Sequence, residues 1–285
     1  MFASFSSTLM SFPPHRIQNL GRINFYHHKS SSALTLCFIP GFRSSFRSSI
    51  KSTHLFNWTQ QHNVGFLTWD HDDETSIQDW CQQGKDIITA QLLSTTNHQK
   101  LLFVGASLGT WLAIRIAHDL LHDTDVMKKV TVQGLIGIGG GVDTTERWLQ
   151  ELGAPSNGHN VEGGIWRRPS EYASQGHYDI SLSFLKASRP ALLLQSDDIN
   201  DITYPIHLIH GALDNDVPLT HVFELLDWVR KRQLSHLPST TTDLAHLHLI
   251  KDGDHRLSRP QDLRLLDNVL NTCADVMDLD DSYTK

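Results

Sequence analysis

A serine between two glycines is the residue whose surroundings point most directly to chemistry. The segment Gly105-Ala106-Ser107-Leu108-Gly109 matches the pattern G-x-S-x-G, in which a sharp turn from strand into helix exposes a nucleophilic hydroxyl. An apolar run, Leu101–Val104, precedes it and an amphipathic stretch follows it, as such a turn requires. The pattern alone is weak, and an ordinary Gly/Ser turn between strand and helix is the alternative. The context favours a catalytic Ser107.

Two further side chains complete a candidate catalytic set. A serine hydroxyl is a weak nucleophile unless a base, itself oriented by an acid, takes its proton. With serine on such a turn, the partners follow in the order Ser, Asp, His. Asp214 lies in the loop after an apolar strand that ends at His210-Gly211, and His255 lies in the loop after the next strand. We therefore predict a triad of Ser107, Asp214 and His255. Asp216 is the second choice for the acid.

Two alternatives to this triad stay open. Both aspartates precede a helix and would serve equally well as its caps. His255 is one of 18 histidines, so a surface position without function is the competing interpretation.

A donor for the oxyanion is predicted in the loop after the strand-like segment 33–39. This segment ends abruptly at Pro40-Gly41, where such folds supply one amide to the transition state. The backbone N–H groups of Phe42 and Leu108 are the predicted oxyanion-hole donors. Each would stabilise the tetrahedral intermediate by about 3 kcal/mol.

The elements that must position these residues alternate between strand and helix. Strands are expected at 22–27, 33–39, 64–69, 101–104, 130–138, 206–209 and 244–250, and helices at 44–61, 76–93, 107–121, 220–232 and 260–276. The first two strands, joined by Lys29-Ser30-Ser31-Ser32, are expected to form a hairpin. The alternation predicts the α/β class: a mostly parallel central sheet, helices on both faces, and a cap insertion at about 143–205. We expect a single domain over 17–277 and a disordered tail at 278–285.

Composition limits the partners and the location. The formal net charge of −7 opposes binding to nucleic acid, and no run approaches the ~18 consecutive apolar residues of a transmembrane segment. The three cysteines form no CxxC pair, so no disulfide framework is expected. Residues 1–69 hold no Asp or Glu, and residues 1–16 are rich in serine. Residues 1–16 are therefore either a short presequence, which favours a mitochondrial over a cytoplasmic location, or a frayed extension.

Several segments together resemble one family of the α/β-hydrolase superfamily, the mitochondrial palmitoyl-protein thioesterases, also named mycophenolic acid acyl-glucuronide esterases. The resemblance spans about residues 34–275. Besides the serine turn it rests on Phe38-Ile39-Pro40-Gly41, Trp166-x-x-Pro169-Ser170-x-Tyr172, Ser183-Phe184-Leu185-Lys186, Leu208-Ile209-His210-Gly211 and Asp254-His255-Arg256. The resemblance implies the α/β-hydrolase fold, the same catalytic Ser107, Asp214 and His255, and ester or thioester substrates. Three features depart from the family: Thr110, where a second glycine is expected, the acid-rich stretch at 70–74 after Trp69, and the unfamiliar stretch 144–160. The last two border the expected acyl pocket, so they leave substrate identity open.

The predicted function is hydrolysis of an ester or thioester of a hydrophobic acyl group through an acyl-enzyme, on an S-acylated protein or an acylated small molecule. Trp166, Arg167 and Arg168 in the insertion are candidate substrate-binding residues. Core packing for Trp166 and simple solvation for the two arginines are the alternatives. A catalytically inactive binding scaffold with the same fold is the rival function.

No cofactor and no metal are predicted. Gly137-Ile138-Gly139-Gly140-Gly141 lacks the G-x-G-x-x-G spacing of a dinucleotide loop. His246 and His248 fall on one face of a strand, but no third ligand is spaced to join them.

Overall fold

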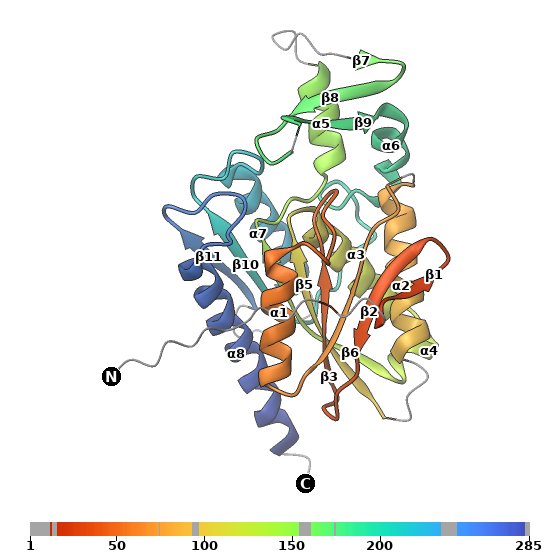
Figure 1. The fold of residues 1–285 in the computed structure, drawn as a ribbon. Coiled ribbons are helices and arrows are strands. Elements are labelled where there is room, and N and C mark those ends of the chain that lie inside the picture. Colours follow the sequence, from red (N-terminus) through yellow and green to blue (C-terminus); the bar gives the residue numbers. More distant parts are fainter. Residues whose placement is uncertain are drawn as a thin grey trace.

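The computed structural model describes residue 12 and residues 16–73, 75–92, 97–153, 161–173, 175–234 and 244–282, with side chains described as far as residue 274. These residues include an eight-stranded sheet of order β1-β2-β4-β3-β5-β6-β10-β11 (Figure 1). Its strands are β1 (Gln18–Leu20), β2 (Ile23–His28), β3 (Leu34–Ile39), β4 (Gly65–Trp69), β5 (Gln99–Ala106), β6 (Val130–Ile138), β10 (Ile206–Gly211) and β11 (Ala245–Ile250). Neighbours from β4 to β11 run parallel, while β1–β2 and β2–β4 are antiparallel. The predicted mostly parallel sheet is confirmed.

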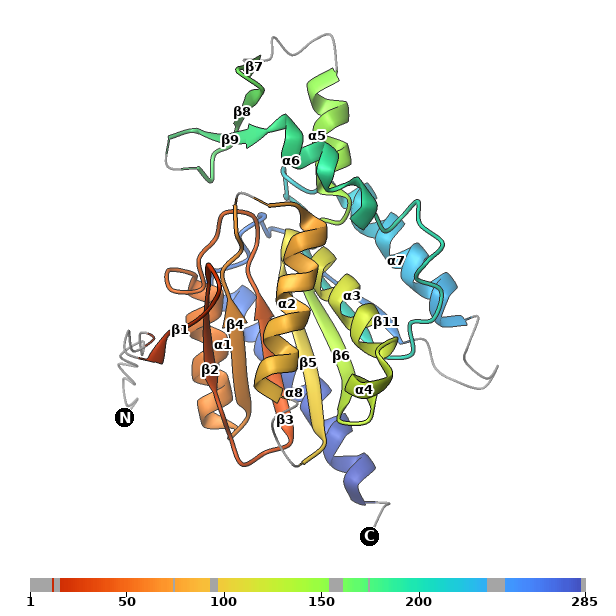
Figure 2. The same ribbon diagram turned by 90° about the vertical axis from the view of Figure 1, so that its right-hand side faces the viewer.

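Helices cover both faces of this sheet (Figure 2). One face carries α2 (Ile77–Leu92), α3 (Leu108–Leu121) and α7 (Leu219–Leu234), and the other carries α1 (Ile50–Gln61) and α8 (Pro260–Ser282). The short α4 (Thr124–Met127) follows α3. An apolar cluster fills each helix–sheet interface, so the central strands are buried from both sides. This is why β3 is apolar or buried along all six of its residues instead of alternating with polar ones.

The parallel strands bring distant segments of the chain to one edge of the sheet. Because parallel strands end on the same side, the turns after them meet at the carboxyl edge. Phe42 follows β3, Ser107 follows β5, Asp214 follows β10 and His255 follows β11. The fold therefore gathers the residues that the sequence singles out.

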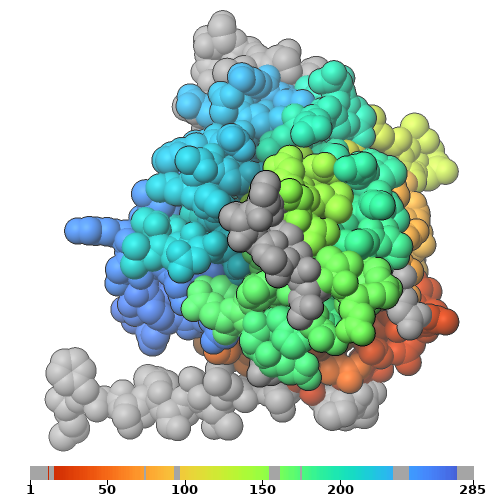
Figure 3. All heavy atoms as spheres, turned by 90° about the horizontal axis from the view of Figure 1, so that it is seen from above, coloured from red at the N-terminus to blue at the C-terminus, as the bar shows by residue number. Residues whose placement is uncertain are grey.

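The segment between β6 and β10 forms a cap above this edge (Figures 1 and 3). It contains α5 (Thr144–Gly153), β7 (Val161–Glu162), β8 (Ile165–Pro169), β9 (His177–Ser181), α6 (Leu182–Ala187) and a 3-10 turn (Arg189–Ala191). The three strands form a separate antiparallel sheet. Trp148, Trp166, Ile180 and Leu185 form the buried centre of the cap. The insertion therefore has regular structure and a small core of its own.

One buried carboxylate ties the two ends of the cap together. Asp143, at the start of the cap, accepts the N–H groups of Leu193 at 2.7 Å and Leu194 at 2.9 Å. These bonds satisfy backbone donors that the turn would otherwise leave unpaired in a buried place. Asp143 thus fixes the start of the cap to residues 193 and 194 on its returning side.

Two expectations about the N-terminal third are wrong. β2 and β3 do not form a hairpin, because β4 lies between them and pairs with both. The connection spans two strand spacings, about 10 Å, which its few residues reach easily. Helix α1 begins at Ile50 instead of residue 44, because the Phe46 N–H is held by Asp70 Oδ1 at 3.0 Å. Ser49 then caps the helix by accepting the Ser52 N–H at 3.3 Å.

At the two ends of the chain the structure also differs from expectation. Helix α8 continues to Ser282, although a disordered tail was expected from residue 278. The predicted presequence, 1–16, lies outside the described residues except for Phe12 and Arg16. Phe12 is buried, and its ring lies between 5.0 and 6.0 Å from four other aromatic rings, those of Tyr26, Phe46, Phe56 and Phe66. Phe12 therefore packs as part of the folded domain.

None of the described helices has the combination of length and apolar character that crossing a bilayer requires.

Candidate active site

Ser107 occupies the sharp turn between β5 and α3. Its backbone, with φ 52° and ψ −121°, is costly for a residue that carries a side chain. The Ser107 N–H donates to the Ile138 carbonyl at 2.8 Å, and the Gly141 N–H donates to the Ser107 carbonyl at 3.2 Å. A Cβ on Gly109 would lie 2.2 Å from the Ile39 carbonyl oxygen, so only glycine lets α3 approach β3 this closely. The turn thus holds the Ser107 hydroxyl at the carboxyl edge.

The three predicted catalytic side chains lie within hydrogen-bonding distance of one another. Ser107 Oγ is 3.0 Å from His255 Nε2, and His255 Nδ1 is 2.8 Å from Asp214 Oδ2. An ionised carboxylate can only accept, so Nδ1 carries the ring proton. Nε2 then presents its lone pair to the Ser107 hydroxyl. This tautomer is the one that can receive the hydroxyl proton when the oxygen attacks.

Asp214 is held in its place by backbone amides. Its side chain is fully buried, and Oδ1 accepts the N–H groups of Asp216 at 2.9 Å and Val217 at 2.8 Å. Burial raises the pKa of Asp214, but the hydrogen bond and charge of His255 and the Val217 amide outweigh it, so the pKa lies below its ordinary value. His210 braces the same loop by donating from Nε2 to the Val217 carbonyl at 3.0 Å. Asp214 is therefore ionised and oriented toward the imidazole.

Asp216, the second choice for the acid, faces the cap. Its Oδ1 lies 3.5 Å from Arg168 Nη1, and its carbonyl accepts from Arg147 Nη2 at 2.7 Å. The geometry thus places Asp214, and not Asp216, beside His255.

The loop after β3 passes beside the serine turn. A Cβ on Gly41 would lie 3.2 Å from Ser107 Cβ and 3.1 Å from the Ala106 carbonyl oxygen, so the two backbones are in contact. Phe42 follows in this loop, and Leu108 is the first residue of α3. Amide groups at a helix N-terminus point outward and favour an anion. Both predicted oxyanion-hole donors therefore lie next to Ser107.

His71 bonds to the loop that carries Phe42, and the sequence did not reveal this contact. Its Nε2 donates to the Pro40 carbonyl at 3.0 Å, and its ring stacks on Trp80 with centroids 4.7 Å apart. Burial lowers the pKa of His71 to about 4, so the ring is neutral near pH 7. The one available signal was its place two residues after the end of β4, at the same carboxyl edge. We infer that His71 positions the loop that carries Phe42.

A cavity of about 290 Å³ opens onto Ser107 and His255. Its aromatic walls are Phe38, Phe42, Trp148, Tyr172 and Tyr178, and its charged lining residues are Lys51, Arg168, Asp216 and Arg256. The Tyr172 ring, from the cap, lies 5.6 Å from the His255 ring, and the Arg256 guanidinium lies 5.0 Å from the Tyr172 ring. The cap therefore closes the site over the predicted base.

Lys51 is a second supporting residue that the sequence did not reveal. Its Nζ donates to the Arg256 carbonyl and lies 3.4 Å from Ser258 Oγ, so it holds the loop that carries His255. Burial lowers the pKa of Lys51 to about 8. The residues around position 51 do not predict this contact, because the loop that Lys51 holds lies some 200 positions further along the chain.

The structure separates the three residues proposed to bind substrate. Trp166 is fully buried in the centre of the cap, and Arg167 is half exposed, 3.6 Å from Asp179; neither lines the cavity. Arg168 does line it, with an 11% exposed side chain that is bonded to Glu151 at 3.1 Å. Alternation along β8 explains the difference, because Trp166 and Arg168 point toward the interior while Arg167 points outward.

Comparisons with known proteins agree with this fold. No family model matches the chain. It is 27% identical over 241 residues to the mitochondrial palmitoyl-protein thioesterase ABHD10 of Mus musculus, covering 81% of this chain and 72% of that protein. A crystal structure of a putative hydrolase from Agrobacterium vitis S4 matches with a TM-score of 0.72 and 23% identity, covering 90% of this chain and 96% of the other. The alpha/beta hydrolase domain-containing protein 10 from mouse matches with a TM-score of 0.68 and 23% identity, covering 92% and 98%.

Proposed function

We propose that this chain, which has the α/β-hydrolase fold and resembles the mitochondrial palmitoyl-protein thioesterases, hydrolyses an ester or thioester of a hydrophobic acyl group. One observation carries the proposal: the unbroken relay from Ser107 Oγ through His255 to Asp214, with contacts of 3.0 and 2.8 Å, opening into a cavity. The resemblance to a thioesterase supports the same class of substrate.

In the proposed reaction Ser107 Oγ attacks the acyl carbonyl carbon and passes its proton to His255 Nε2. The Asp214 carboxylate stabilises the imidazolium, and the amides of Phe42 and Leu108 hold the oxyanion. The carbonyl re-forms and the bond to the leaving oxygen or sulfur breaks, with the His255 proton going to the leaving group. Water then attacks the acyl-enzyme, with His255 again as base, and releases the acid and Ser107.

The volume and the lining of the cavity indicate which acyl and leaving groups it could hold. Its volume of about 290 Å³ lies at the lower end of the range for small-molecule sites, ~300–1,000 Å³. Aromatic walls suit an apolar acyl group. Lys51 and Arg256 suit a polar leaving group, whereas the charge of Arg168 is already balanced by Glu151 and Asp216. S-depalmitoylation is the activity that the relative's name suggests, with acyl-glucuronides and small carboxylic esters as the second substrate class. Measuring kcat/KM on a series of acyl thioesters and p-nitrophenyl esters of increasing chain length separates these classes.

The proposal is tested by covalent labelling of the serine. A fluorophosphonate probe should label the wild-type protein, and Ser107→Ala should abolish the label. Ser44→Ala is the matched control, because Ser44 lines the same cavity without contacting the triad, and it should keep full labelling. Absence of labelling in folded wild-type protein would support the inactive binding scaffold instead.

We also propose a mitochondrial location. The relative is named as a mitochondrial protein, and residues 1–69 of this chain hold no acidic residue. Import of the full chain into isolated mitochondria, with and without residues 1–11, tests it; uptake that is equal for both would refute the presequence.

A further inference from the structure

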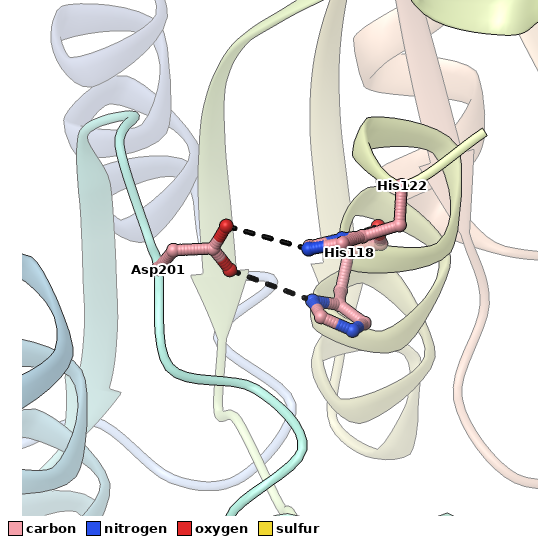
Figure 4. Close-up of side chains that lie close together, drawn as sticks. All are labelled: His118, His122 and Asp201. Atoms are coloured by element: carbon pink, nitrogen blue, oxygen red, sulfur yellow. Dashed lines mark hydrogen bonds and ion pairs between the residues drawn. The ribbon is translucent and has the colours of Figure 1, made fainter. Parts of the chain in front are cut away.

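Two histidines and an aspartate gather at the end of α3 that lies away from Ser107, where the proposed hydrolysis has no use for them (Figure 4). His118 lies on α3 and His122, one helical turn later, is the C-cap residue of that helix. Asp201 lies on the segment that leads from the cap into β10. Their ligand atoms all lie within 4.8 Å of one another. We propose that His118, His122 and Asp201 bind one divalent transition-metal ion, with Zn²⁺ as the best match.

The hydrogen bonding of His122 leaves a lone pair aimed at the carboxylate. Its Nδ1 lies 2.9 Å from the His118 carbonyl oxygen, which can only accept, so Nδ1 carries a proton. In the neutral ring Nε2 therefore has a lone pair, and it faces Asp201 Oδ2 at 3.4 Å. Two acceptors that face each other repel, and either a ring proton or a metal ion between them removes that repulsion. A histidine that donates its other ring N–H to a backbone carbonyl is also the usual arrangement of a metal ligand.

The other oxygen of the same carboxylate is left unsatisfied. Asp201 Oδ1 is shielded from solvent and makes no hydrogen bond within the described part of the chain. Its neighbour is His118 Nδ1, at 3.8 Å, which is too long for a hydrogen bond. A buried carboxylate oxygen without a donor is costly, and coordination of a cation would remove that cost.

The spacing of these atoms suits zinc. Bonds of about 2.0–2.1 Å in a tetrahedral site put ligand atoms roughly 3.3 Å apart. The two imidazole nitrogens lie 3.4 and 3.8 Å from the two oxygens of the Asp201 carboxylate, and the ligand atoms all lie within 4.8 Å of one another, so small side-chain movements would bring them to bonding positions. Two imidazoles and a carboxylate are ligands that Zn²⁺ accepts, and water would fill the remaining position. Asp198, another carboxylate close to His118, is already paired with Arg115. The C-terminus of α3 carries the negative end of the helix dipole, which also favours a cation there.

The site is built to join two parts of the fold. An ion there would fasten the segment before β10 to α3. His118 lies eleven residues after Ser107, about 16 Å along the helix. This distance predicts an effect on stability and none on the chemistry at Ser107.

The test uses protein without a histidine tag. Calorimetric titration with ZnCl₂ should show one ion per wild-type chain with micromolar or tighter affinity. His122→Ala and the nearly isosteric Asp201→Asn should each weaken it at least about tenfold. His246→Ala is the matched control, because His246 belongs to a different group of rings, 4.5 Å from His207, and its loss should change nothing. Co²⁺ in place of zinc should give visible absorption in wild type that Asp201→Asn abolishes.

Other outcomes overturn the proposal. They are no binding at 100 µM Zn²⁺, equal binding by Asp201→Asn, or loss of binding in His246→Ala. Zinc should also raise the Tm of wild type by several degrees, reversibly on adding EDTA, and leave that of Asp201→Asn unchanged. Circular dichroism and the urea midpoint show whether Asp201→Asn is folded, so a failed zinc site can be recognised whether or not the wild type hydrolyses esters.

Discussion

Replacing Asp214 by asparagine tests the relay at its most specific point. The amide oxygen of Asn can keep the bonds that Asp214 Oδ1 accepts from the Asp216 and Val217 amides, at 2.9 and 2.8 Å. The amide nitrogen then replaces Oδ2 and donates to His255 Nδ1. The ring must move its proton to Nε2, where it faces the Ser107 hydroxyl as a donor and cannot accept a proton. Asp214→Asn therefore keeps the shape of the site, but His255 Nε2 becomes a proton donor and can no longer act as the base.

The size of the effect follows from that inversion. Losing the correct tautomer in a triad costs about 10⁴-fold in kcat, which corresponds to roughly 5.4 kcal/mol of transition-state stabilisation. KM should change little, because Asp214 is fully buried and does not line the cavity. Steady-state hydrolysis of a p-nitrophenyl ester at neutral pH measures both constants. Circular dichroism and the urea midpoint establish that the variant is folded.

Asp216→Asn is the matched control. Asp216 lies two residues away in the same loop and contacts Arg168 of the cap, 3.5 Å away, and not the imidazole. It should keep kcat within about tenfold of wild type. A loss in Asp216→Asn that equals or exceeds the loss in Asp214→Asn would refute the assignment of the acid and the argument from the tautomer.

Three further results are expected. Gly109→Ala should lower the free energy of unfolding by more than about 3 kcal/mol or prevent folding, since its Cβ would lie 2.2 Å from a backbone oxygen of Ile39; a Tm near that of wild type would contradict this. His71→Phe keeps an aromatic ring against Trp80 but leaves the buried Pro40 carbonyl without its donor, so stability should fall by about 1–3 kcal/mol and kcat should fall more than KM rises. Because the folded pKa of Asp214 is lowered, its charge stabilises the fold above the unfolded pKa near ~3.9, and this contribution disappears as pH falls through the lower folded pKa. The difference in free energy of unfolding between wild type and Asp214→Asn, measured with urea, should therefore be constant from pH 5 to 7 and shrink below about pH 4. A difference that grows below pH 4 would contradict the direction of the pKa shift.

The sequence could predict which residues meet at one edge of the sheet because the order of strands carries positional information. Once 101–104, 206–209 and 244–250 are taken as parallel strands, the residues just beyond their carboxyl ends must share an edge. That rule selects Asp214 and His255 from 31 acidic residues and 18 histidines. It does not separate Asp214 from Asp216, since both lie in one loop. The amides of Asp216 and Val217 decide that question, and no pattern in the sequence predicts them.

Supporting residues stayed hidden because their partners are distant in the chain. His71 acts on Pro40, and Lys51 acts on the loop of His255; each contact exists only after the sheet forms. The proposed zinc site also depends on a partner that is distant in the chain. His118 and His122 have the spacing of a helical ligand pair, but Asp201 comes from beyond the whole cap. The hairpin was predicted wrongly for a related reason, since the short link after β2 says nothing about β4 entering between the two strands.

The cap and the acid loop are joined, and this restricts how substrate can enter. Arg147 on α5 donates to the Asp216 carbonyl at 2.7 Å, and Arg168 on β8 lies 3.5 Å from the Asp216 carboxylate. The Asp216 N–H in turn bonds to Asp214 at 2.9 Å. A cap that lifted at α5 and β8 would therefore pull on the residue that orients His255. The contact between Tyr172 and the His255 ring involves no hydrogen bond and is the easier one to release. In the proposed hydrolase, entry along the Tyr172 side would leave Asp214 and its amides in place, so the proposed triad would stay assembled while an acyl group enters the cavity.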